Sequence, residues 1–422
     1  MTKIDTGKMN ETAYFTKLPN GLGIFLVKKP GFSKKAAVLG VNYGSVDTAF
    51  TLDGQHYETP LGMAHFLEHK LFDLPDERNT LQLLSQMGAS PNAFTSSTAT
   101  AYYFTCNDNF MPAFELLLEF VCTPYFTPES VEKEQGIIAQ EIYMRDDMPE
   151  FRLFNEVFAS LYSKHPIRHP IIGTHDSIKT ITADTLYSCY NTFYRPSNMV
   201  LTVVGDLDPD EIEKAALRLT PSEKLSAPDF SCDEPQDIAE REKTIRMNVP
   251  QPMFTLGVKL VPRADQLPWE IDCQLALAAL AGPQSRLYGE LYDSGLIDSN
   301  FGSIPYLFKK GGVLLIKGRS NNPLTIRDSL EREIDSINNN SIDPQLFERV
   351  KRATWGERMR VSDNPEALAR SIALDYMAGA DYFSLPQTLD SANVDSVHSL
   401  FSNMRNISIV ICDNIQEVKN DV

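Results

Sequence analysis

The sequence predicts an α+β fold made of two similar domains. The chain has 422 residues, of which 42% are apolar, so it is long enough to form more than one domain. Both halves alternate β-branched stretches with stretches of helical apolar spacing. Between them, residues 226–240 are rich in Pro, Ser and acidic side chains and lack an apolar period, which is typical of a linker. We therefore expect an N-terminal domain at 1–225 and a homologous C-terminal domain at 241–422.

The N-terminal half is predicted to begin with strands. Strands are expected at 22–29, 36–47, 92–106 and 197–206, because each stretch is rich in β-branched or aromatic residues or alternates in polarity. Thr59 and Pro60 look like the N-cap and first position of a helix, and the apolar spacing continues this helix to Leu71. Further helices are expected at 111–122, 128–146 and 208–219.

The C-terminal half repeats this alternation. Its predicted strands are 253–260, 311–318 and 407–413, and its predicted helices lie near 267–281, 324–339, 344–361 and 364–378. The repeat is visible in the order of the elements and not in residue identity. The order nevertheless predicts a duplicated α+β unit.

The composition excludes several classes of partner. The formal net charge of −17 argues against nucleic acid and anionic membranes, since both require a positively charged protein surface. An acidic surface permits cationic or neutral peptide ligands, and it also keeps cytosolic proteins in solution.

The N-terminal stretch lacks the apolar core of a signal peptide, and no apolar run approaches the roughly 18 residues of a membrane span. We therefore expect a cytoplasmic protein. The six cysteines form no CxxC pair and predict neither a disulfide framework nor a cysteine zinc site.

Residues 61–72, LGMAHFLEHKLF, place His65, Glu68 and His69 on an otherwise apolar helix. Burying two imidazoles and a carboxylate is costly unless a ligand compensates their desolvation. Histidines at i and i+4 project from one helix face about 6 Å apart, so both can reach a zinc ion at about 2.1 Å. A lone histidine on an apolar helix is more often a packed core residue, but this spacing favours a metal site.

Glu68 is adjacent to this pair without being forced to bind the metal, which suits a general base acting on water. Zinc lowers the pKa of a bound water molecule to about 7 and polarises a peptide carbonyl. A hydrolytic zinc site needs a third protein ligand and one open position. Glu134 and Glu141 are seven residues apart on the helix predicted at 128–146, so they lie on nearly one face.

The HxxEH motif in a strand–helix context marks the inverzincins. The sequence resembles the pitrilysin and insulin-degrading-enzyme peptidases, and more closely the two-domain subunits similar to mitochondrial processing peptidase. Four blocks match in order: TPLGMAHFLEHKLF, GASPNAFTSSTATAYYF, VEKEQGIIAQEI and FYRPSNMVLTVVGDLD. The resemblance implies a mostly antiparallel sheet packed with helices in each domain, and zinc-dependent hydrolysis of peptide bonds.

The resemblance also implies roles for single residues. The third ligand of the family is the later of two glutamates, which is Glu141 here, 141 − 69 = 72 residues after the second histidine. Glu134 then occupies a supporting position that orients the ligands. Asn92 and Ala93 fall on an edge strand that pairs with the backbone of an extended peptide. An ordinary edge strand capped by asparagine is the alternative. One zinc ion per chain, bound by His65, His69 and Glu141, is expected.

One family feature is absent. Relatives carry an Arg and a Tyr seven positions apart in the C-terminal half, where they grip the substrate and stabilise the oxyanion; this sequence has Tyr292 and Ser299 instead. Loss of such a donor typically lowers the rate about 10²–10³-fold. We therefore expect a heterodimer with a homologous metal-free subunit that supplies both groups. A homodimer is disfavoured, because two copies still lack the pair.

The sequence further resembles bacterial two-component peptidases, some of which remove leader peptides from ribosomally made, modified peptides. The segments that carry this resemblance are GLIDSNF, HFLEHKLF and SPNAFTS.

Two alternatives to this peptidase interpretation remain. The chain could be a non-catalytic scaffold subunit, although relatives of that kind generally lose the zinc ligands. It could also be a peptide-binding protein whose metal is structural, in which case Glu68 would have no catalytic role. The remaining histidines show no comparable spacing and are interpreted as loop or packing residues; they are His56, His165, His169, His175 and His398.

Overall fold

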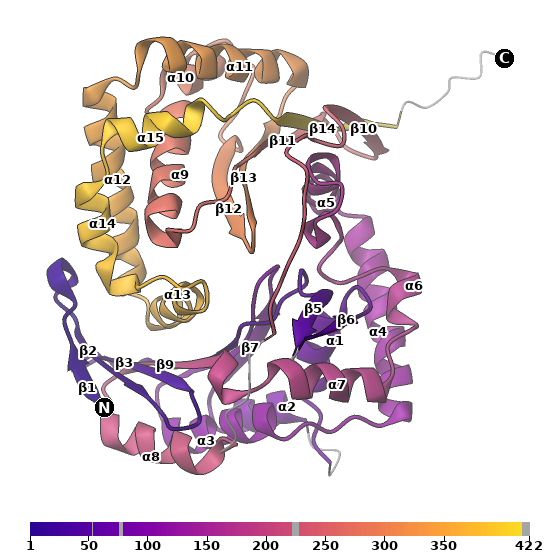
Figure 1. Cartoon of the computed structure of the whole chain (residues 1–422), viewed down its shortest axis with the longest axis vertical. Coiled ribbons are helices and arrows are strands. Elements are labelled where there is room, and N and C mark those ends of the chain that lie inside the picture. The colour runs from indigo at the N-terminus through magenta and orange to yellow at the C-terminus, as the bar shows by residue number, and fades with distance from the viewer. Residues whose placement is uncertain (53, 76–78, 222–227, 416–422) are drawn as a thin grey trace. The chain divides into compact units, whose positions relative to one another are not determined.

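A computed structural model describes residues 1–52, 54–75, 79–221 and 228–415 (Figure 1). The chain forms two compact units, each made of discontinuous segments. Unit 1 contains Met1–Ile142, Pro170–Ser231 and Glu357–Gln387, and unit 2 contains Tyr143–His169, Cys232–Gly356 and the described residues from Thr388 onward. One passage between the units, after Ser231, lies inside the linker predicted at 226–240, of which residues 226 and 227 are outside the described residues.

Unit 1 is built on a seven-stranded sheet with the order β1-β2-β3-β9-β4-β8-β7. β3 and β9 pair in parallel, and the other neighbours are antiparallel. β5 (Ala49–Leu52) and β6 (Gln55–Glu58) form a separate hairpin. The strands of the large sheet are β1 (Thr2–Ile4), β2 (Thr12–Lys17), β3 (Gly23–Lys28), β4 (Lys35–Val41), β7 (Ser90–Thr95), β8 (Thr100–Cys106) and β9 (Met199–Gly205).

Helices of unit 1 pack around this sheet. They are α1 (Met63–Lys70), α2 (Thr80–Gln86), α3 (Phe110–Cys122), α6 (His175–Ile178), α7 (Ala183–Phe193), α8 (Pro209–Leu219) and α13 (Pro365–Met377), with 3₁₀ turns η1 (Gly7–Met9), η3 (Pro196–Asn198) and η4 (Tyr382–Ser384). Three helices run across a unit boundary: α4 (Pro128–Asp146), α12 (Pro344–Ser362) and α14 (Leu385–Ser391).

The single strand predicted at 92–106 is wrong in one respect, because it is a hairpin of β7 and β8. The turn between them contains no glycine or proline. Instead, the Ser96 backbone N–H and the Ser96 hydroxyl both donate to the Ala99 carbonyl, and the Ala99 N–H donates back to the Ser96 hydroxyl. Serine side chains can replace backbone turn signals in this way. The hairpin places β7 at the open edge of the sheet.

Unit 2 is built on a five-stranded sheet with the order β10-β14-β11-β13-β12. β10 and β14 pair in parallel, and the other neighbours are antiparallel. The strands are β10 (Glu242–Met247), β11 (Met253–Lys259), β12 (Gly302–Phe308), β13 (Gly311–Arg319) and β14 (Ile407–Asn414). The helices are α5 (Pro149–Leu161), α9 (Gln266–Ala281), α10 (Arg286–Asp293), α11 (Pro323–Asn340) and α15 (Val394–Phe401), with the 3₁₀ turn η2 (Pro166–Arg168).

The two sheets share one topology. The segment β3-β9-β4-β8-β7 of unit 1 has the same order and the same single parallel pair as β10-β14-β11-β13-β12 of unit 2. The predicted α+β fold with two similar, mostly antiparallel sheets is therefore confirmed. The four helices predicted in the C-terminal half are present as α9, α11, α12 and α13.

Each sheet is covered by a helix that comes from the other half of the sequence. α13 packs on β4 and β9 of unit 1, whereas α5 packs on β11 and β14 of unit 2, which are the equivalent strands. Leu368, Ala369 and Ile372 of α13 are almost fully buried in the core of unit 1. The contiguous domains at 1–225 and 241–422 stay a prediction, and this exchange of helices adds a feature that the sequence pattern does not reveal.

Among the described residues, none of the helices combines the length and the apolar character that crossing a lipid bilayer would require.

A buried ion pair joins two segments of unit 2. The Lys259 ammonium is 5% exposed and donates to Glu234 Oε1 at 2.8 Å and to the Leu161 carbonyl at 3.0 Å. Glu234 also accepts backbone N–H bonds from Ser163, Lys164 and His165. Burial raises the pKa of Glu234, but these hydrogen bonds outweigh it and lower the pKa below its ordinary value of 4.5. This carboxylate therefore anchors the chain that follows α5 to the strand β11.

Replacing Glu234 by Gln should destabilise the protein by about 2 kcal/mol at neutral pH, since it leaves the Lys259 ammonium buried without a counter-charge. The folded-state pKa of Glu234 is lowered, so the stabilisation is present above its unfolded pKa and is lost as the pH falls through the folded value. Urea unfolding of both proteins at pH 7 and near pH 3 measures this: the difference should shrink at the acidic pH. An equal difference at both values would contradict the assignment.

Candidate metal centre

Helix α1 brings both histidines of the HxxEH motif onto one face. His65 is 8% exposed, and its ring lies 4.5 Å from the ring of His69, centroid to centroid, at an angle of 53°. The i and i+4 spacing produces this arrangement, because such residues follow one another along a helix face. Two imidazoles therefore meet at the inner side of α1, as predicted.

Glu141 joins them from the long helix α4. Its Oε2 atom lies 3.6 Å from His65 Nε2 and 3.7 Å from His69 Nε2. Two ligand atoms bound to one tetrahedral zinc ion at about 2.1 Å are about 3.4 Å apart, so these separations fit a shared ion. The three ligand atoms lie within 4.8 Å of one another, and no second group of this kind occurs in the described part of the chain. Two imidazole nitrogens and one carboxylate are a donor set that suits zinc and leaves a fourth position open.

Glu134 holds the second histidine. His69 Nδ1 lies 2.9 Å from Glu134 Oε1. An ionised carboxylate only accepts, so Nδ1 carries the proton and Nε2 keeps the lone pair that faces Glu141. Burial lowers the pKa of His69, but the hydrogen bond and the charge of Glu134 outweigh it, and the pKa is raised overall. Glu134 thus fixes both the orientation and the tautomer of this imidazole.

Glu68 is held by a residue that sequence reasoning missed. The Thr95 hydroxyl, at the end of the edge strand β7, donates to Glu68 Oε2 at 2.5 Å. Burial raises the pKa of Glu68, the Thr95 bond and His69 lower it, and the net result is a raised pKa. A carboxyl group of this kind is closer to neutrality than an exposed glutamate, which suits proton transfer. Thr95 is three residues from Asn92 on the predicted edge strand. This position was the one signal in the sequence that could have identified Thr95 as part of the site.

Asn92 and Ala93 lie on β7 as expected, at the edge of the sheet. The Ala93 backbone N–H donates to the Asn92 side-chain oxygen at 2.8 Å, so it is not engaged with β8. An N–H group directed away from the neighbouring strand is one that an added strand can use. The geometry is therefore compatible with both the substrate role and the ordinary edge strand.

The N-terminus of α1 depends on two glycines. The predicted cap at Thr59 and Pro60 is wrong: α1 begins at Met63, and its cap is Gly62 with φ +85°. A Cβ atom on Gly62 would lie 2.7 Å from the Ile172 carbonyl oxygen, and one on Gly173 would lie 2.7 Å from that of Leu61. The two backbones can approach closely because neither residue has a side chain. This contact sets where the face of α1 that carries His65 and His69 begins.

The other residues named in the sequence analysis do not join the cluster. His165 is a buried packing residue of unit 2, since its Nδ1 accepts from the Ile167 N–H and its Nε2 contacts the Lys309 carbonyl. Tyr292 is 52% exposed on α10 and stacks with Tyr288. Ser299 follows α10 in a turn before β12.

Two family models match the chain. One, described as insulinase (peptidase family M16), covers residues 52–175 and so contains all the clustered residues. The other, described as peptidase M16 inactive domain, covers residues 180–354. The part of the chain that matches the insulinase model is thus the part that holds the His-His-Glu cluster.

Related proteins align along most of the chain. It is 36% identical over 412 residues to a protein named uncharacterized zinc protease YmfH of Bacillus subtilis, which spans 94% of this chain and 95% of that one. An uncharacterized zinc protease of Mycobacterium leprae is 30% identical over 322 residues, covering 71% and 67% of the two chains. The crystal structure of an M16-like peptidase from Alicyclobacillus acidocaldarius superimposes with a TM-score of 0.92 and 30% identity, covering 97% of this chain and 100% of that one.

Replacing Gly62 by Ala should lower the free energy of unfolding by about 2–4 kcal/mol, because the new Cβ adds a clash with a backbone oxygen to the strain of a positive φ. Gly88 is a matched control: its φ is +80°, but a Cβ there meets nothing within 4 Å. Gly88→Ala should cost only about 1 kcal/mol. Chemical denaturation measures both, and equal losses would show that the Gly62–Gly173 approach does not matter.

Proposed function

Because this chain belongs to the insulinase family, peptidase family M16, we propose that it is the zinc-binding subunit of a metalloendopeptidase that hydrolyses unfolded oligopeptides. The observation that carries this proposal is the meeting of His65, His69 and Glu141 from two helices at separations that fit one zinc ion. Relatives named zinc proteases support the same metal.

Zinc held by these three residues would lower the pKa of a water molecule and polarise a peptide carbonyl. Glu68 then acts as the general base: its carboxylate takes the proton of the attacking water and returns it to the leaving amine. The raised pKa of Glu68 supports this double role, since the group must both accept and release a proton near neutral pH. The Thr95 hydroxyl orients Glu68, and Glu134 orients His69.

The peptide is proposed to bind along β7. An extended substrate would add a strand to the open edge through main-chain hydrogen bonds, a mode of binding that would accept many peptide sequences. In this state the Ala93 N–H exchanges its bond with the Asn92 side chain for one to the peptide, and the Asn92 amide becomes available to the scissile peptide group. Thr95 on the same strand contacts Glu68, so strand and base are held together.

The natural substrates are proposed to be short unfolded peptides, including leader segments of ribosomally made, modified peptides. The resemblance of GLIDSNF, HFLEHKLF and SPNAFTS to bacterial two-component peptidases supports this choice. The net charge of −17 favours peptides that are not strongly acidic.

A second subunit is proposed to complete the enzyme. The Arg and Tyr that relatives use on the substrate are replaced by Tyr292 and Ser299, neither of which supplies a cation. A homologous chain that lacks zinc ligands but carries both groups would restore them, whereas a homodimer would not. This partner remains separate from the zinc proposal, and either can hold without the other.

A non-catalytic scaffold is the second candidate. The match of residues 180–354 to a family model described as an inactive domain favours it for the C-terminal half. The intact His-His-Glu cluster in the N-terminal half argues against it for the whole chain. A peptide-binding protein with a structural metal is a third candidate, and the role of Glu68 separates it from the peptidase.

Replacing Glu68 by Gln should lower peptide turnover about 10²–10⁴-fold while zinc content stays at one per chain, because the proton acceptor is lost but no ligand is. Replacing Glu141 by Gln should lower both peptide turnover and zinc content, because a zinc ligand is lost. Replacing Glu134 by Gln should weaken zinc affinity about 10–100-fold. Elemental analysis and a fluorogenic peptide assay measure these effects. The exposed Glu132 lies on the same helix α4, so Glu132→Gln is the control that should change neither. Undiminished turnover by the Glu68 variant would refute the catalytic assignment.

The chain alone should show about 1% or less of the activity of the reconstituted pair, in line with the loss of an oxyanion donor. The test compares peptide turnover by this chain, by a homologue that lacks HxxEH and has the Arg and Tyr, and by their equimolar mixture. Co-elution and activity only in the mixture are expected. Full activity of this chain alone would refute the two-subunit proposal without affecting the zinc proposal.

A further inference from the structure

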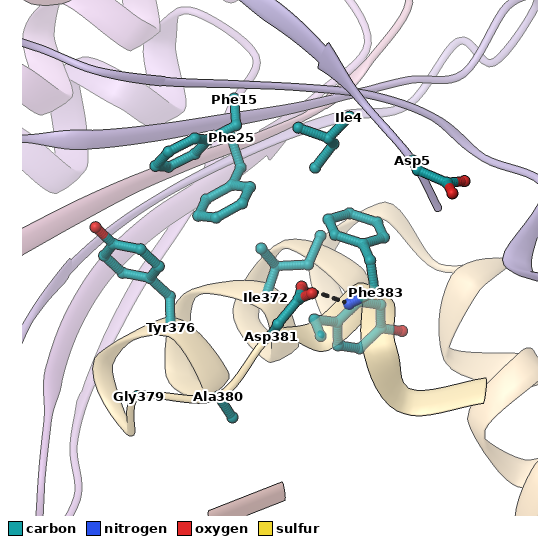
Figure 2. Close-up of a pocket in the computed structure, with 11 residues that line it drawn as sticks. Ile4, Asp5, Phe15, Phe25, Ile372, Tyr376, Gly379, Ala380, Asp381 and Phe383 are labelled. Carbon is teal, nitrogen blue, oxygen red and sulfur yellow. Dashed lines mark hydrogen bonds between the residues drawn. The ribbon is translucent and has the colours of Figure 1, made fainter. Parts of the chain in front are cut away.

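Unit 1 contains a cavity of about 410 Å³ between the strands β1 to β3 and the end of α13 (Figure 2). All its lining residues belong to unit 1, and none of them is part of the His-His-Glu site. The volume is within the roughly 300–1,000 Å³ of small-molecule sites. The cavity is therefore large enough for a small organic ligand.

Aromatic rings dominate the walls. Phe25 is central: its ring lies 4.6 Å from Phe15, 5.4 Å from Tyr376 and 6.4 Å from Phe383, centroid to centroid. The interplanar angles of these pairs are 39°, 73° and 38°, so the rings are inclined to one another and do not form a flat stack. Figure 2 shows Phe15 and Phe25 on the strand side and Phe383 on the opposite side, with Tyr376 beside them. Inclined rings around a space offer several negative π-faces to one ligand.

An exposed carboxylate, that of Asp381, borders these rings. Figure 2 shows the Asp381 side chain on the helix side of the cavity, beside Ile372, and its Oδ1 accepts the Phe383 N–H at 3.0 Å. The turn after α13 places it there: Gly379 has φ +80°, and the Ala380 N–H donates to the Asp375 carbonyl at 2.8 Å. Such a glycine-dependent helix end fixes the direction of the next residue. The aspartate is thus held in place by the backbone.

The charge of the lining is one-sided. Asp5 is the second carboxylate that borders the cavity, and no lysine, arginine or histidine is among the residues that line it. A lining with carboxylates and aromatic rings, and with no cation of its own, complements a positively charged ligand that also has apolar surface. A strongly hydrated ammonium group would lose much of its hydration in such a place, whereas methyl groups on nitrogen reduce that loss.

We propose that this cavity binds a small organic cation, a quaternary or methylated ammonium compound, with its positive nitrogen between the rings of Phe25 and Tyr376 and the carboxylate of Asp381. The binding is independent of zinc and of peptide hydrolysis. Its free energy comes from cation–π contact, from burial of methyl groups and from the charge of Asp381.

Titration calorimetry of the full chain with choline tests the proposal. 3,3-Dimethylbutan-1-ol has the same shape but replaces the quaternary nitrogen by carbon, so it is the neutral control. Choline should bind at least about tenfold more tightly than the alcohol, and n-butylammonium, a mimic of a lysine side chain, should bind more weakly than choline. Equal binding of choline and the alcohol would mean that the cavity is merely apolar. Tighter binding of n-butylammonium, or no binding of choline at millimolar concentration, would also overturn the proposal.

Two variants locate the site. Asp381→Asn replaces the carboxylate oxygen that accepts the Phe383 N–H with an amide oxygen that can also accept it, so the variant should fold while losing the charge. Its choline affinity should fall about tenfold. Phe25→Leu removes a π-face with little change in volume and should give a similar loss. Asp184→Asn, at an exposed aspartate in the first turn of α7, changes the net charge by the same amount and should leave choline affinity unchanged. Unaltered affinity in both cavity variants, with circular dichroism showing folded proteins, would refute the site.

Discussion

The candidate metal centre requires three polar donors from two helices to meet in a partly buried place that also contains other carboxylates. Glu68, Glu134 and Glu141 face two imidazoles there, so the cluster has an excess of negative charge when both histidines are neutral. A divalent cation would offset this excess, so the donor set and its electrostatics both favour such a ligand. The Thr95 hydroxyl holds the Glu68 side chain, and the Gly62 cap fixes the start of α1, which carries both histidines.

The two units share a fold, but within the described residues the His-His-Glu cluster occurs in unit 1 alone. In unit 1 the connection from β4 to β7 contains α1 and α2, and α1 bears the HxxEH motif. The equivalent connection in unit 2, from β11 to β12, contains α9 and α10. α9 is buried along most of its length by apolar side chains such as Trp269, so this helix serves the core. The two units share their strand order. The helices in the equivalent connections differ, because α1 carries the histidines and Glu68 whereas α9 carries mainly apolar side chains.

The sequence alone predicted those parts of the site that depend on residues close together in the chain. The i, i+4 spacing of the histidines predicted that they share a helix face, and the seven-residue spacing of Glu134 and Glu141 predicted the same for them. That these two faces meet was implied by the family resemblance. The sequence failed where tertiary contacts decide the outcome. Thr59 and Pro60 imitate a helix cap, but the close approach of Gly62 to another loop moves the start of α1 by three residues. The contact between Thr95 and Glu68 joins two elements 27 residues apart, and no periodicity encodes it.

The exchange of α5 and α13 bears on how the protein forms during translation. The sheet of unit 1 is complete in sequence once β9 ends at Gly205, yet the apolar face of β4 and β9 is covered by residues up to Met377. A nascent chain therefore carries this face without its covering helix while about 170 further residues are added, by the difference 377 − 205 = 172. A ribosome-bound intermediate of this kind exposes an aggregation-prone surface that folding factors would need to shield until α13 has been synthesised.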